Sequence, residues 1–566
     1  MEAYQAIQGW IRAGAVPSEP QRVDPQQATG ASVTLRLSGA VVGRASVVDE
    51  EGLAVWRASR DAWAEARRRL RPDTREGADD EPEHAELVER TALIAIDLQI
   101  AGPLTPIGGA GLEEAAGEAS PGLHGVAARV GRRFEAVFPG TMLATNITPA
   151  QGLVIAMSAL DLPRAGIGDP RVNLDALRRE HGLSLYRFEV AHLAQVSSDR
   201  PPRFLYRGGR VRQMSEINER SLREFGDGLF EHILAHRWVG EEPFGLMSAY
   251  RPWAGDYEQP MIAEARSQAL AAYALARWSA LMRTEATEAL ALHYAEAAAS
   301  LLEKLAQETE EGPDIGASAT AAALSLLARA ALGADSLSAE ANELLDRRCL
   351  SLAVEMLENQ SASAGERAIV AFALARLSSG DEAPVERDRV RAVVRELFRT
   401  TSAGDLPSLM PWLGWAELAM VEDQPDVPAG VALRSFRSTV WRHQVEPRDV
   451  GEEGLDLVGG IVFTRGRAPL PSWHTLRPLA FIATMLGDDR LTDDEEVGAE
   501  LLRLMGSIRF VLQLSVDETH MHMFRDRGRS LGGVRLAPWD HRLTPEANAM
   551  ALLTVAETLE SVRRRR

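Results

Sequence analysis

The stretch of sequence that decides the fold is Ala269-Leu270-Ala271-Ala272-Tyr273-Ala274-Leu275-Ala276. Nearly all of its side chains are small and apolar, so a helix formed here has no polar side to turn toward water and is expected to be buried. Small side chains also let such a helix pack closely against its neighbours. Helices of this kind are expected at 260–283, 317–333, 364–379, 406–421, 475–487 and 544–562.

More highly charged helices are expected to alternate with these along the chain. Their ranges are 214–238, 286–309, 338–358, 385–400, 430–445 and 494–515. A charged side is typical of an amphipathic helix that faces solvent. Pairing one helix of each kind gives a hairpin that repeats about every 45–60 residues, which predicts a helical repeat array. Because about six hairpins suit a closed ring, we predict an (α/α)6 toroid.

The segment before the helices predicts a different architecture. Alternating β-branched runs such as 32–37 and 93–100 are typical of strands, and Gly and Pro mark the turns between them. The fold class is therefore multidomain, with an α+β N-terminal domain followed by an all-α (α/α)6 toroid. The predicted divisions are a leader over 1–28, the α+β domain over 29–200, a linker hairpin and closing helix over 201–240, and the toroid over 241–566.

Several short motifs in the N-terminal part match one known family. They are Val33-Thr34-Leu35 with Gly39 and Gly43, Ile94–Ile100 followed by Pro103 and Pro106-Ile107, Gly125-Val126 with Gly131, Val137-Phe138-Pro139, and Leu174–Phe188. In this order the segment over about 28–200 resembles the AMMECR1 family. The resemblance implies the fold of that family. The family has no settled activity, so the resemblance implies none for this chain.

The most characteristic run of that family, Leu-Arg-Gly-Cys-Ile-Gly, is degenerate in this chain. It falls on 41–46, where only Gly43 is kept, Val42 stands in the Arg position and Arg44 in the Cys position. Chemistry that depends on the run is therefore expected to be lost. We expect this domain to have a structural role or to hold the ring, in preference to carrying an active site.

Composition excludes several classes of function. The chain has 566 residues, 45% hydrophobic and 25% charged, with a net charge of −19, so it repels nucleic acid and anionic lipid. Cys349 is the single cysteine, which rules out an intrachain disulfide and a cysteine zinc site. We find no signal peptide and no apolar run long enough to span a membrane, so a cytoplasmic location is expected. Dinucleotide, P-loop, HExxH and GxSxG motifs are also absent from the sequence.

Three long loops, at about 239–259, 446–474 and 516–543, each precede a helix of the small, apolar kind. In an alternating ring those helices all begin at the same end, so the loops should gather over one mouth of the ring. Long ordered loops in compact domains are usually functional. We therefore predict the working face there. Trp412 and Trp415, inside a helix, are expected to be core residues.

The first two loops combine aromatic, acidic and basic side chains suited to a small-molecule or glycan ligand. Asp256 and Glu258 are candidate acid/base residues, with helix capping as the structural alternative. Aromatic faces can stack on sugar rings, and arginine can bind an anionic group, with surface charge balance as the alternative. The predicted substrate-binding residues here are Tyr250, Trp253, Tyr257, Glu264, Trp473, His474 and Arg477.

The third loop carries the remaining candidates. His520 and His522, on an extended strand, would present both rings on one side, a spacing that can bind a divalent metal. No third ligand is identifiable, so we assign no metal and no cofactor. His520, His522 and Asp540 are predicted catalytic residues, with a polar hairpin packed on the rim as the alternative. The predicted substrate-binding residues in this loop are Arg525, Arg535 and Trp539.

Two functions compete on this basis. One is a carbohydrate-active enzyme, a hydrolase, lyase or epimerase, working through acid/base residues at the mouth of the toroid. The other is a non-catalytic binding or scaffold protein that presents the loop face to a peptide or protein. A deep polar cavity lined by the named acids would favour the enzyme.

Overall fold

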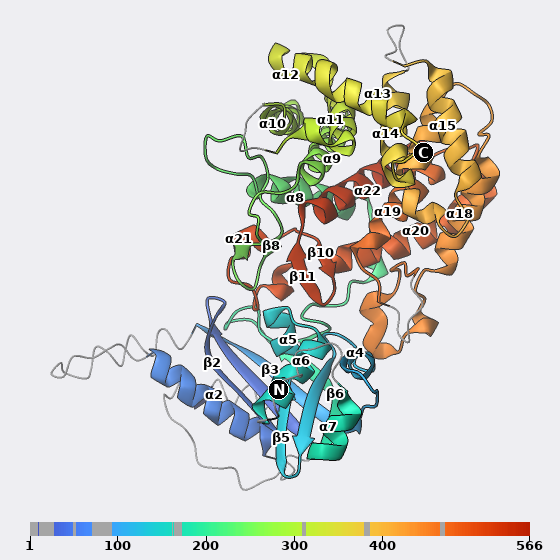
Figure 1. Cartoon of the computed structure of the whole chain (residues 1–566). Coiled ribbons are helices and arrows are strands. Elements are labelled where there is room, and N and C mark those ends of the chain that lie inside the picture. The colour runs from blue at the N-terminus through green and yellow to red at the C-terminus, as the bar shows by residue number, and fades with distance from the viewer. Residues whose placement is uncertain are drawn as a thin grey trace, which may run out of the picture.

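The structure is a computed structural model that describes residues 9–10, 28–48, 53–70, 93–160, 162, 173–307, 313–378, 385–463 and 470–566. The expected leader over 1–28 lies outside the described residues except at 9, 10 and 28. Figure 1 shows a sheet-containing part below and a helical part above. The predicted layout of a sheet-containing part followed by a mainly helical part agrees with the structure, although the helical part also contains a small four-stranded sheet.

The N-terminal part is built on a seven-stranded antiparallel sheet with the order β2-β1-β3-β6-β4-β5, in which β7 also pairs with β6. Helix α2 packs on β1 and β2, and α6 packs on β4 and β5. The strands are β1 (Gly30–Leu37), β2 (Ala40–Val48), β3 (Ile94–Pro106), β4 (His124–Val130), β5 (Arg133–Val137), β6 (Leu183–Ala194) and β7 (Arg203–Leu205). The helices are α2 (Ala54–Leu70), α4 (Leu112–Ala116), α5 (Pro139–Thr145), α6 (Pro149–Ala159) and α7 (Leu174–His181).

Gly43, the one residue kept from the degenerate family run, has a packing role. A Cβ added there would overlap the backbone oxygen of Ala62 in α2. Glycine at this position therefore lets α2 lie directly on β2, and the apolar core of this region forms between them around Trp63 and Val33.

One face of the sheet is polar and yet buried. Strand residues alternate between faces, and Val33 and Leu35 point into the core under α2. The other face carries buried polar side chains: Ser32, Thr34, Arg36, Asp97, Gln99 and His192. Buried polar groups are uncommon unless something satisfies them, and this face lies against α5 and the third long loop. Gly140 of α5, for example, donates to Gln99.

The helical part consists of buried helices surrounded by amphipathic ones. Along α11 nearly every residue is buried, whereas α15 buries only Val390, Val394 and Leu397, one side of the helix. The buried helices are α9 (Ala265–Met282), α11 (Ala319–Leu332), α14 (Ala364–Leu377), α17 (Trp412–Met420), α19 (Leu476–Leu486) and α22 (Pro545–Arg564). The others are α8 (Glu219–Ala235), α10 (Glu288–Leu305), α12 (Ala339–Leu344), α13 (Leu350–Glu358), α15 (Arg387–Thr400), α18 (Gly430–Arg442) and α20 (Asp494–Leu514).

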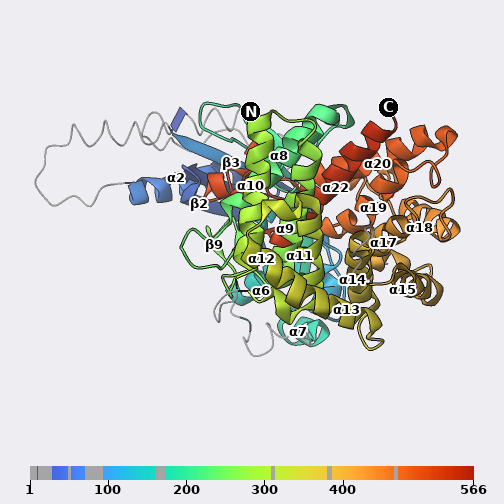
Figure 2. The same cartoon turned by 90° about the horizontal axis from the view of Figure 1, so that it is seen from above.

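The contacts between the buried helices run from the first to the last. Helix α9 packs on α11, α11 on α14, α14 on α17, and α17 on α19; α22 then packs on both α19 and α9. Figure 2 views these helices from above, with α10, α12, α13, α15 and α18 outside them. Among the described helices, none combines the length and apolar character needed to cross a membrane.

One predicted helix is divided in the structure. The range 406–421 contains α16 (Leu406–Leu409) and α17, separated at Met410 and Pro411. Proline has no N–H to donate and its ring clashes with the preceding turn, so a continuous helix cannot pass through Pro411.

The three long loops gather at the end of the helical part that faces the N-terminal sheet. The first and third loops share a four-stranded sheet with the order β10-β11-β8-β9. Its strands are β8 (Tyr250–Arg251), β9 (Asp256–Tyr257), β10 (Arg535–Ala537) and β11 (Asp540–Leu543). Leu143 of α5 packs into the same apolar cluster as Tyr250 and Phe524. The loop end is thus covered by the N-terminal part.

Arg207 links the N-terminal part to the second and third long loops. Its guanidinium donates to the Pro121 oxygen at 2.9 Å and the Ser120 hydroxyl at 2.9 Å, and forms an ion pair with Asp456 of the second loop. The side chains of Arg207 and Asp456 are 1% and 0% exposed. Arg207 also lies over the ring of Trp539 in the third loop. We call this contact between the two parts the domain seam.

Removing Arg207 should weaken the fold far more than removing an exposed arginine of the same seam. Arg207→Met leaves the Asp456 carboxylate buried without its partner, which costs about 3–5 kcal/mol of unfolding free energy. Arg200, which pairs with Glu518 at 3.0 Å with both side chains more than half exposed, is the matched control. Arg200→Met should cost about 1 kcal/mol or less. Urea unfolding of the full chain measures both, and equal losses would show that Arg207 does not hold the seam.

Helix α8 offers a matched pair of glycines for testing its packing. A Cβ at Gly226 would overlap the ring of Trp278 in α9, whereas one at Gly228 would meet nothing within 4 Å. Gly226→Ala should therefore lower the unfolding free energy by about 1–3 kcal/mol. Gly228→Ala should raise it by about 0.5–1 kcal/mol, because alanine is the better helix former. Thermal unfolding of both variants checks the contrast, which is absent if α8 does not pack on α9.

Candidate functional site

The predicted residues of the third loop lie mainly in the domain seam. His520 and His522 are each 2% exposed and Arg535 is 1% exposed. Asp540 pairs with Arg542 at 2.6 Å and accepts a hydrogen bond from Asn146 of the N-terminal part. Trp539 lies under Arg207. Arg525 is exposed and its backbone N–H donates to Pro252.

The extended strand expected for His520 and His522 is not observed. The side chain of Asp517 accepts a hydrogen bond from the Thr519 N–H and caps a 3₁₀ turn over Glu518–His520. Such local side-chain bonds compete with a strand. The turn separates the two rings: His520 lies 3.1 Å from the Asp517 carboxylate, while His522 faces Asp97 of the sheet.

Arg535 has a structural environment. Its guanidinium donates to the backbone oxygens of Gln513, Leu514 and Pro538 at 2.7, 3.1 and 2.9 Å. Burial lowers the pKa of this arginine to about 10. Its donors are occupied by the protein's own backbone, so it has little capacity left to bind a substrate.

The first-loop candidates lie on the β8–β9 hairpin beside the seam. Asp256 is exposed and forms a two-point ion pair with Arg251, at 2.7 and 2.6 Å. Glu258 lies 3.7 Å from Arg542. Tyr250 and Tyr257 are buried in the apolar cluster that also contains Leu143 of α5. Trp253 is half-buried, and Glu264 is exposed at the start of α9.

The second-loop candidates lie near a small cavity at the loop end of the buried helices. Trp473 stacks with His474, Arg477 lies over Trp473, and Arg477 pairs with Glu546 at 2.6 Å. Arg477 and Glu546 line this cavity of about 130 Å³, together with Arg266, Glu366 and Trp412. The structure thus distributes the predicted residues over the seam, the hairpin and this small cavity.

A larger cavity of about 280 Å³ opens at the other end of the same helices. Every buried helix contributes to it through residues in its C-terminal half or just beyond, away from the long loops. Its lining includes Tyr273 and Arg277 of α9, Phe372 and Arg376 of α14, Trp415 of α17, Thr484 of α19, Glu557, Glu560 and Arg564 of α22, and Glu422, Asp488 and Arg490 beyond the helix ends. We call it the ring cavity. The described residues that line it include none of the predicted candidates.

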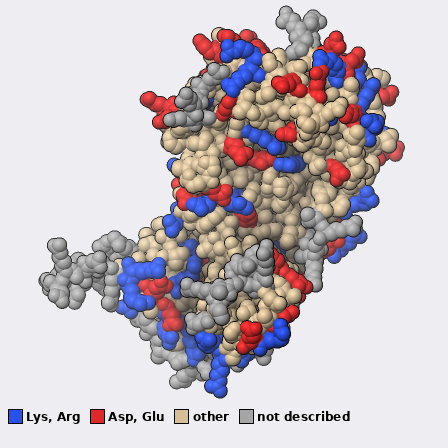
Figure 3. All heavy atoms as spheres, in the orientation of Figure 1, with Lys and Arg blue, Asp and Glu red and all other residues tan. Residues whose placement is uncertain are grey.

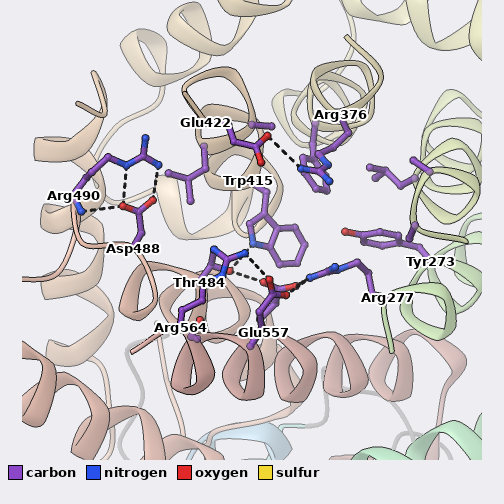
Figure 4. A pocket seen from close by; sticks show the side chains of 18 residues that line it. Tyr273, Arg277, Arg376, Trp415, Glu422, Thr484, Asp488, Arg490, Glu557 and Arg564 are labelled. Carbon is purple, nitrogen blue, oxygen red and sulfur yellow. Dashed lines mark hydrogen bonds and ion pairs between the residues drawn. The ribbon is translucent and has the colours of Figure 1, made fainter. Parts of the chain in front are cut away.

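A hydrogen-bonded network crosses the floor of the ring cavity (Figure 4). Arg277 donates to Glu557 at 2.7 Å and to Glu560 at 2.8 Å. On its other oxygen Glu557 accepts from the Thr484 hydroxyl at 3.1 Å, and Thr484 in turn accepts from the indole N–H of Trp415 at 2.8 Å. The network orients both carboxylates and the edge of the indole ring within the cavity.

The charges of the ring cavity are paired. Arg490 lies 2.6 Å from Asp488, Arg376 lies 3.8 Å from Glu422, and Arg564 pairs with Glu560. Burial favours the neutral form of Asp488, but hydrogen bonds from Arg490 outweigh it and hold the pKa of this carboxyl below its usual value. At Glu560, too, burial favours the neutral form, but the charge of Arg277 outweighs it and keeps the pKa of this carboxyl below its usual value. Both carboxyls are therefore ionised at neutral pH.

Aromatic side chains separate the ring cavity from the small one. Trp412 lies 5.4 Å from Trp415 and 6.3 Å from Phe372 and Tyr273, measured between ring centroids. Trp412 lines the small cavity, whereas the other three line the ring cavity. The predicted core role of Trp412 and Trp415 is consistent with their burial. Each also presents its ring to a cavity.

The sequence does contain a signal for the ring cavity. Arg277, Arg376 and Glu557 are charged residues in the C-terminal halves of helices most of whose residues are buried. A charge in such a helix is costly unless it is paired or lines a polar space. Attention to the loops alone misses this signal, because the residues lie in the helices.

Within the described chain, one group of side chains has the donor atoms of a metal site. Asp97, His192 and His522 offer a carboxylate oxygen and two imidazole nitrogens that all lie within 4.8 Å of one another. All three residues are buried in the seam. Of the predicted pair only His522 belongs to this group, and its partners Asp97 and His192 lie on the N-terminal sheet. His520 lies beside Asp517 instead.

Comparison with protein-family models and with curated proteins gives no match. Among solved structures, the chain is similar to an uncharacterised protein from Pyrococcus horikoshii, at 15% identity and a TM-score of 0.26, over 36% of this chain and 92% of that one. It is also similar to a type II terpene cyclase from Scytonema in complex with its substrate geranylgeranyl dihydroxybenzoate. Here the identity is 11% and the TM-score 0.34, over 61% of this chain and 98% of that one. Similarity at this level carries no conclusion about function.

Acid should destabilise the chain through the histidines of the seam. Burial is the main cause that lowers the pKa of His520 to about 4 and that of His522 to about 3, against about 6.5 in an unfolded chain. Between pH 6.5 and 4 the unfolded chain therefore binds protons that the folded chain does not, and the unfolding free energy falls as the pH falls. From pH 7 to pH 5 each of these histidines should contribute a loss of roughly 2 kcal/mol.

Urea unfolding of chelator-treated protein at pH 7 and pH 5 measures this loss. His522→Gln should make it smaller, because glutamine does not titrate in this range. His293→Gln, at an exposed histidine of α10, should leave it unchanged. An identical pH dependence in wild type and His522→Gln would contradict the expectation.

Proposed function

We propose that the helical part is an (α/α)6 toroid that binds a neutral, polyhydroxylated, sugar-sized molecule in the ring cavity. The observation that carries this proposal is the lining of that cavity, where two ionised carboxylates, arginine N–H groups and aromatic rings converge from α9, α14, α17 and α22 and from the segment after α19. Its volume of about 280 Å³ is close to the lower end of small-molecule sites, about 300–1,000 Å³.

The pairing of charges favours a neutral ligand. Each arginine of the cavity already has a carboxylate partner, so an anionic ligand would have to compete with Glu557, Asp488 or their equivalents. Hydroxyl groups can instead donate to the carboxylates and accept from the arginines without breaking the pairs. Tyr273, Phe372 and Trp415 supply apolar ring surface against which the C–H face of a sugar can pack.

The same geometry favours binding over hydrolysis at this position. A glycosidase needs one carboxylic acid that keeps its proton near neutral pH. Asp488 and Glu560 instead have pKa values held low by arginine. We therefore propose a carbohydrate-directed role in the form of ligand binding, with an enzyme at the loop end as the second candidate.

The loop-end enzyme rests on Asp256, Glu258, His520, His522 and Asp540. His520 and His522 lie buried in the seam, whereas Asp256, Glu258 and Asp540 form ion pairs beside it. A substrate would reach the two histidines only if the two parts of the chain separated. In the scaffold alternative, this loop face binds a peptide or protein. We propose that the AMMECR1-like domain instead packs against that face and stabilises the helical part.

Ligand binding can be tested with a paired set of variants on one helix. A panel of neutral sugars and polyols is first screened by thermal shift with the full chain, and hits are titrated by calorimetry. Glu557→Gln should lower the affinity at least tenfold, about 1.4 kcal/mol, because it removes the negative charge and replaces one of the two acceptor oxygens at the centre of the network with an amide donor. Glu546→Gln is the control, since Glu546 is an arginine-paired glutamate at the other end of α22, and it should bind like wild type.

Two results would contradict the proposal. One is the absence of binding by any neutral sugar or polyol at millimolar concentration. The other is a Glu557→Gln variant that is folded and binds like wild type. If a bound oligosaccharide is cleaved and Glu557→Gln abolishes the cleavage, the cavity is an active site and the proposal of binding alone is wrong.

A further inference from the structure

Asp97, His192 and His522 converge from three segments that are distant in the sequence. Asp97 lies on β3, His192 on the neighbouring β6, and His522 on the third long loop of the helical part. The Asp97 carboxylate lies 2.9 Å from Nε2 of His192 through Oδ1 and 3.9 Å from Nε2 of His522 through Oδ2. Their exposed fractions are 3%, 6% and 2%.

His522 is held with an unpaired nitrogen directed at this carboxylate. Its Nδ1 lies 2.7 Å from the backbone oxygen of Thr519. A carbonyl can only accept, so Nδ1 carries the proton and Nε2 of the neutral ring carries a lone pair. Nε2 is buried and makes no hydrogen bond. A lone pair and a carboxylate oxygen, both acceptors, therefore face each other at 3.9 Å, an arrangement that a cation would stabilise.

The hydrogen bond to Thr519 is the kind that orients a metal ligand. Metal-binding histidines usually donate their second ring N–H to a carbonyl or carboxylate, which fixes the tautomer and the direction of the free nitrogen. Protonating Nε2 instead would place a charge in a buried site, and burial opposes this.

The spacing of the donor atoms suits a small divalent ion. Zinc lies about 2.0–2.2 Å from nitrogen and oxygen ligands in tetrahedral sites, so the ligand atoms of such a site lie roughly 3.4 Å apart. The Asp97 carboxylate lies 2.9 Å from His192 through Oδ1 and 3.9 Å from His522 through Oδ2, and one ligand atom from each residue lies within 4.8 Å of the others. Side-chain shifts on the order of an ångström would bring three ligand atoms to this spacing. Two imidazoles and one carboxylate are ligands of zinc and of other first-row transition ions.

Nε2 of His192 and the Asp97 carboxylate form a hydrogen bond at 2.9 Å, so a bound ion would displace the proton between them to solvent. Arg36 lies on the same face of the sheet, but within the described chain no ion pair within 4 Å joins it to Asp97. His192 forms part of the wall of a groove of about 460 Å³, together with Phe204 and with Glu453 of the second loop. The groove thus reaches one of the three side chains, His192.

We propose that Asp97, His192 and His522 bind one divalent first-row transition ion, and that this ion ties the N-terminal sheet to the third loop of the helical part. The three side chains leave at least one coordination position for water or for a small ligand from the groove. This site is at the loop end of the helical part and is independent of ligand binding in the ring cavity.

Metal titration of the chelator-treated full chain tests the site, with Zn²⁺ as the probe and a chromophoric chelator as competitor. We expect one ion per chain, bound with micromolar or tighter affinity, and a rise in the unfolding temperature on addition of Zn²⁺. His522→Gln and Asp97→Asn should each weaken binding at least 100-fold. His293→Gln should bind like wild type, because that histidine is exposed on α10.

X-ray absorption of the wild-type zinc complex keeps the test decisive if a variant does not fold. Scattering from two imidazoles at about 2.0–2.1 Å supports the site. A spectrum without imidazole scattering, or a wild-type chain that takes up no more zinc than a folded His522→Gln variant, would overturn the proposal.

Discussion

The ion pair between Arg207 and Asp456 is the interaction on which the arrangement of the two parts depends. Its side chains are almost fully withdrawn from water, so each would be left as an isolated buried charge if the other moved away. Arg207 also reaches Ser120, Pro121 and Trp539. Through these contacts a single side chain fixes the N-terminal sheet against two of the long loops.

That attachment decides which surfaces of the chain are accessible. It buries the polar face of the sheet, and with it Asp97 and His192, beneath the third loop. It also covers the end of the helical part where the loops gather. The cavity that stays open lies at the other end, among the C-terminal halves of the buried helices. On the face drawn in Figure 3, acidic and basic side chains are interspersed over the helical part, in keeping with the paired charges of the ring cavity.

Much of the fold could be predicted from local patterns. The runs of small, apolar residues form the buried helices, and the runs with apolar residues on one side only form the amphipathic helices. Burial follows directly from the periodicity of apolar side chains. The gathering of the long loops also followed, since it depends only on the alternation of the helices. Local interactions that compete with the pattern were harder to predict. Asp517 turned an expected strand into a 3₁₀ turn, and Pro411 divided an expected helix.

The sequence by itself determined the class of each segment, the alternation of helices and the polar character of the third loop, because these depend on residues close together in the chain. Only the tertiary structure decided which side chains meet. His522 faces Asp97 although the two residues are more than 400 positions apart in the sequence, and Arg277 meets Glu557 across the contact of the first and last buried helices. No local periodicity encodes such pairs, since they depend on how the two parts dock and on how the helices pack.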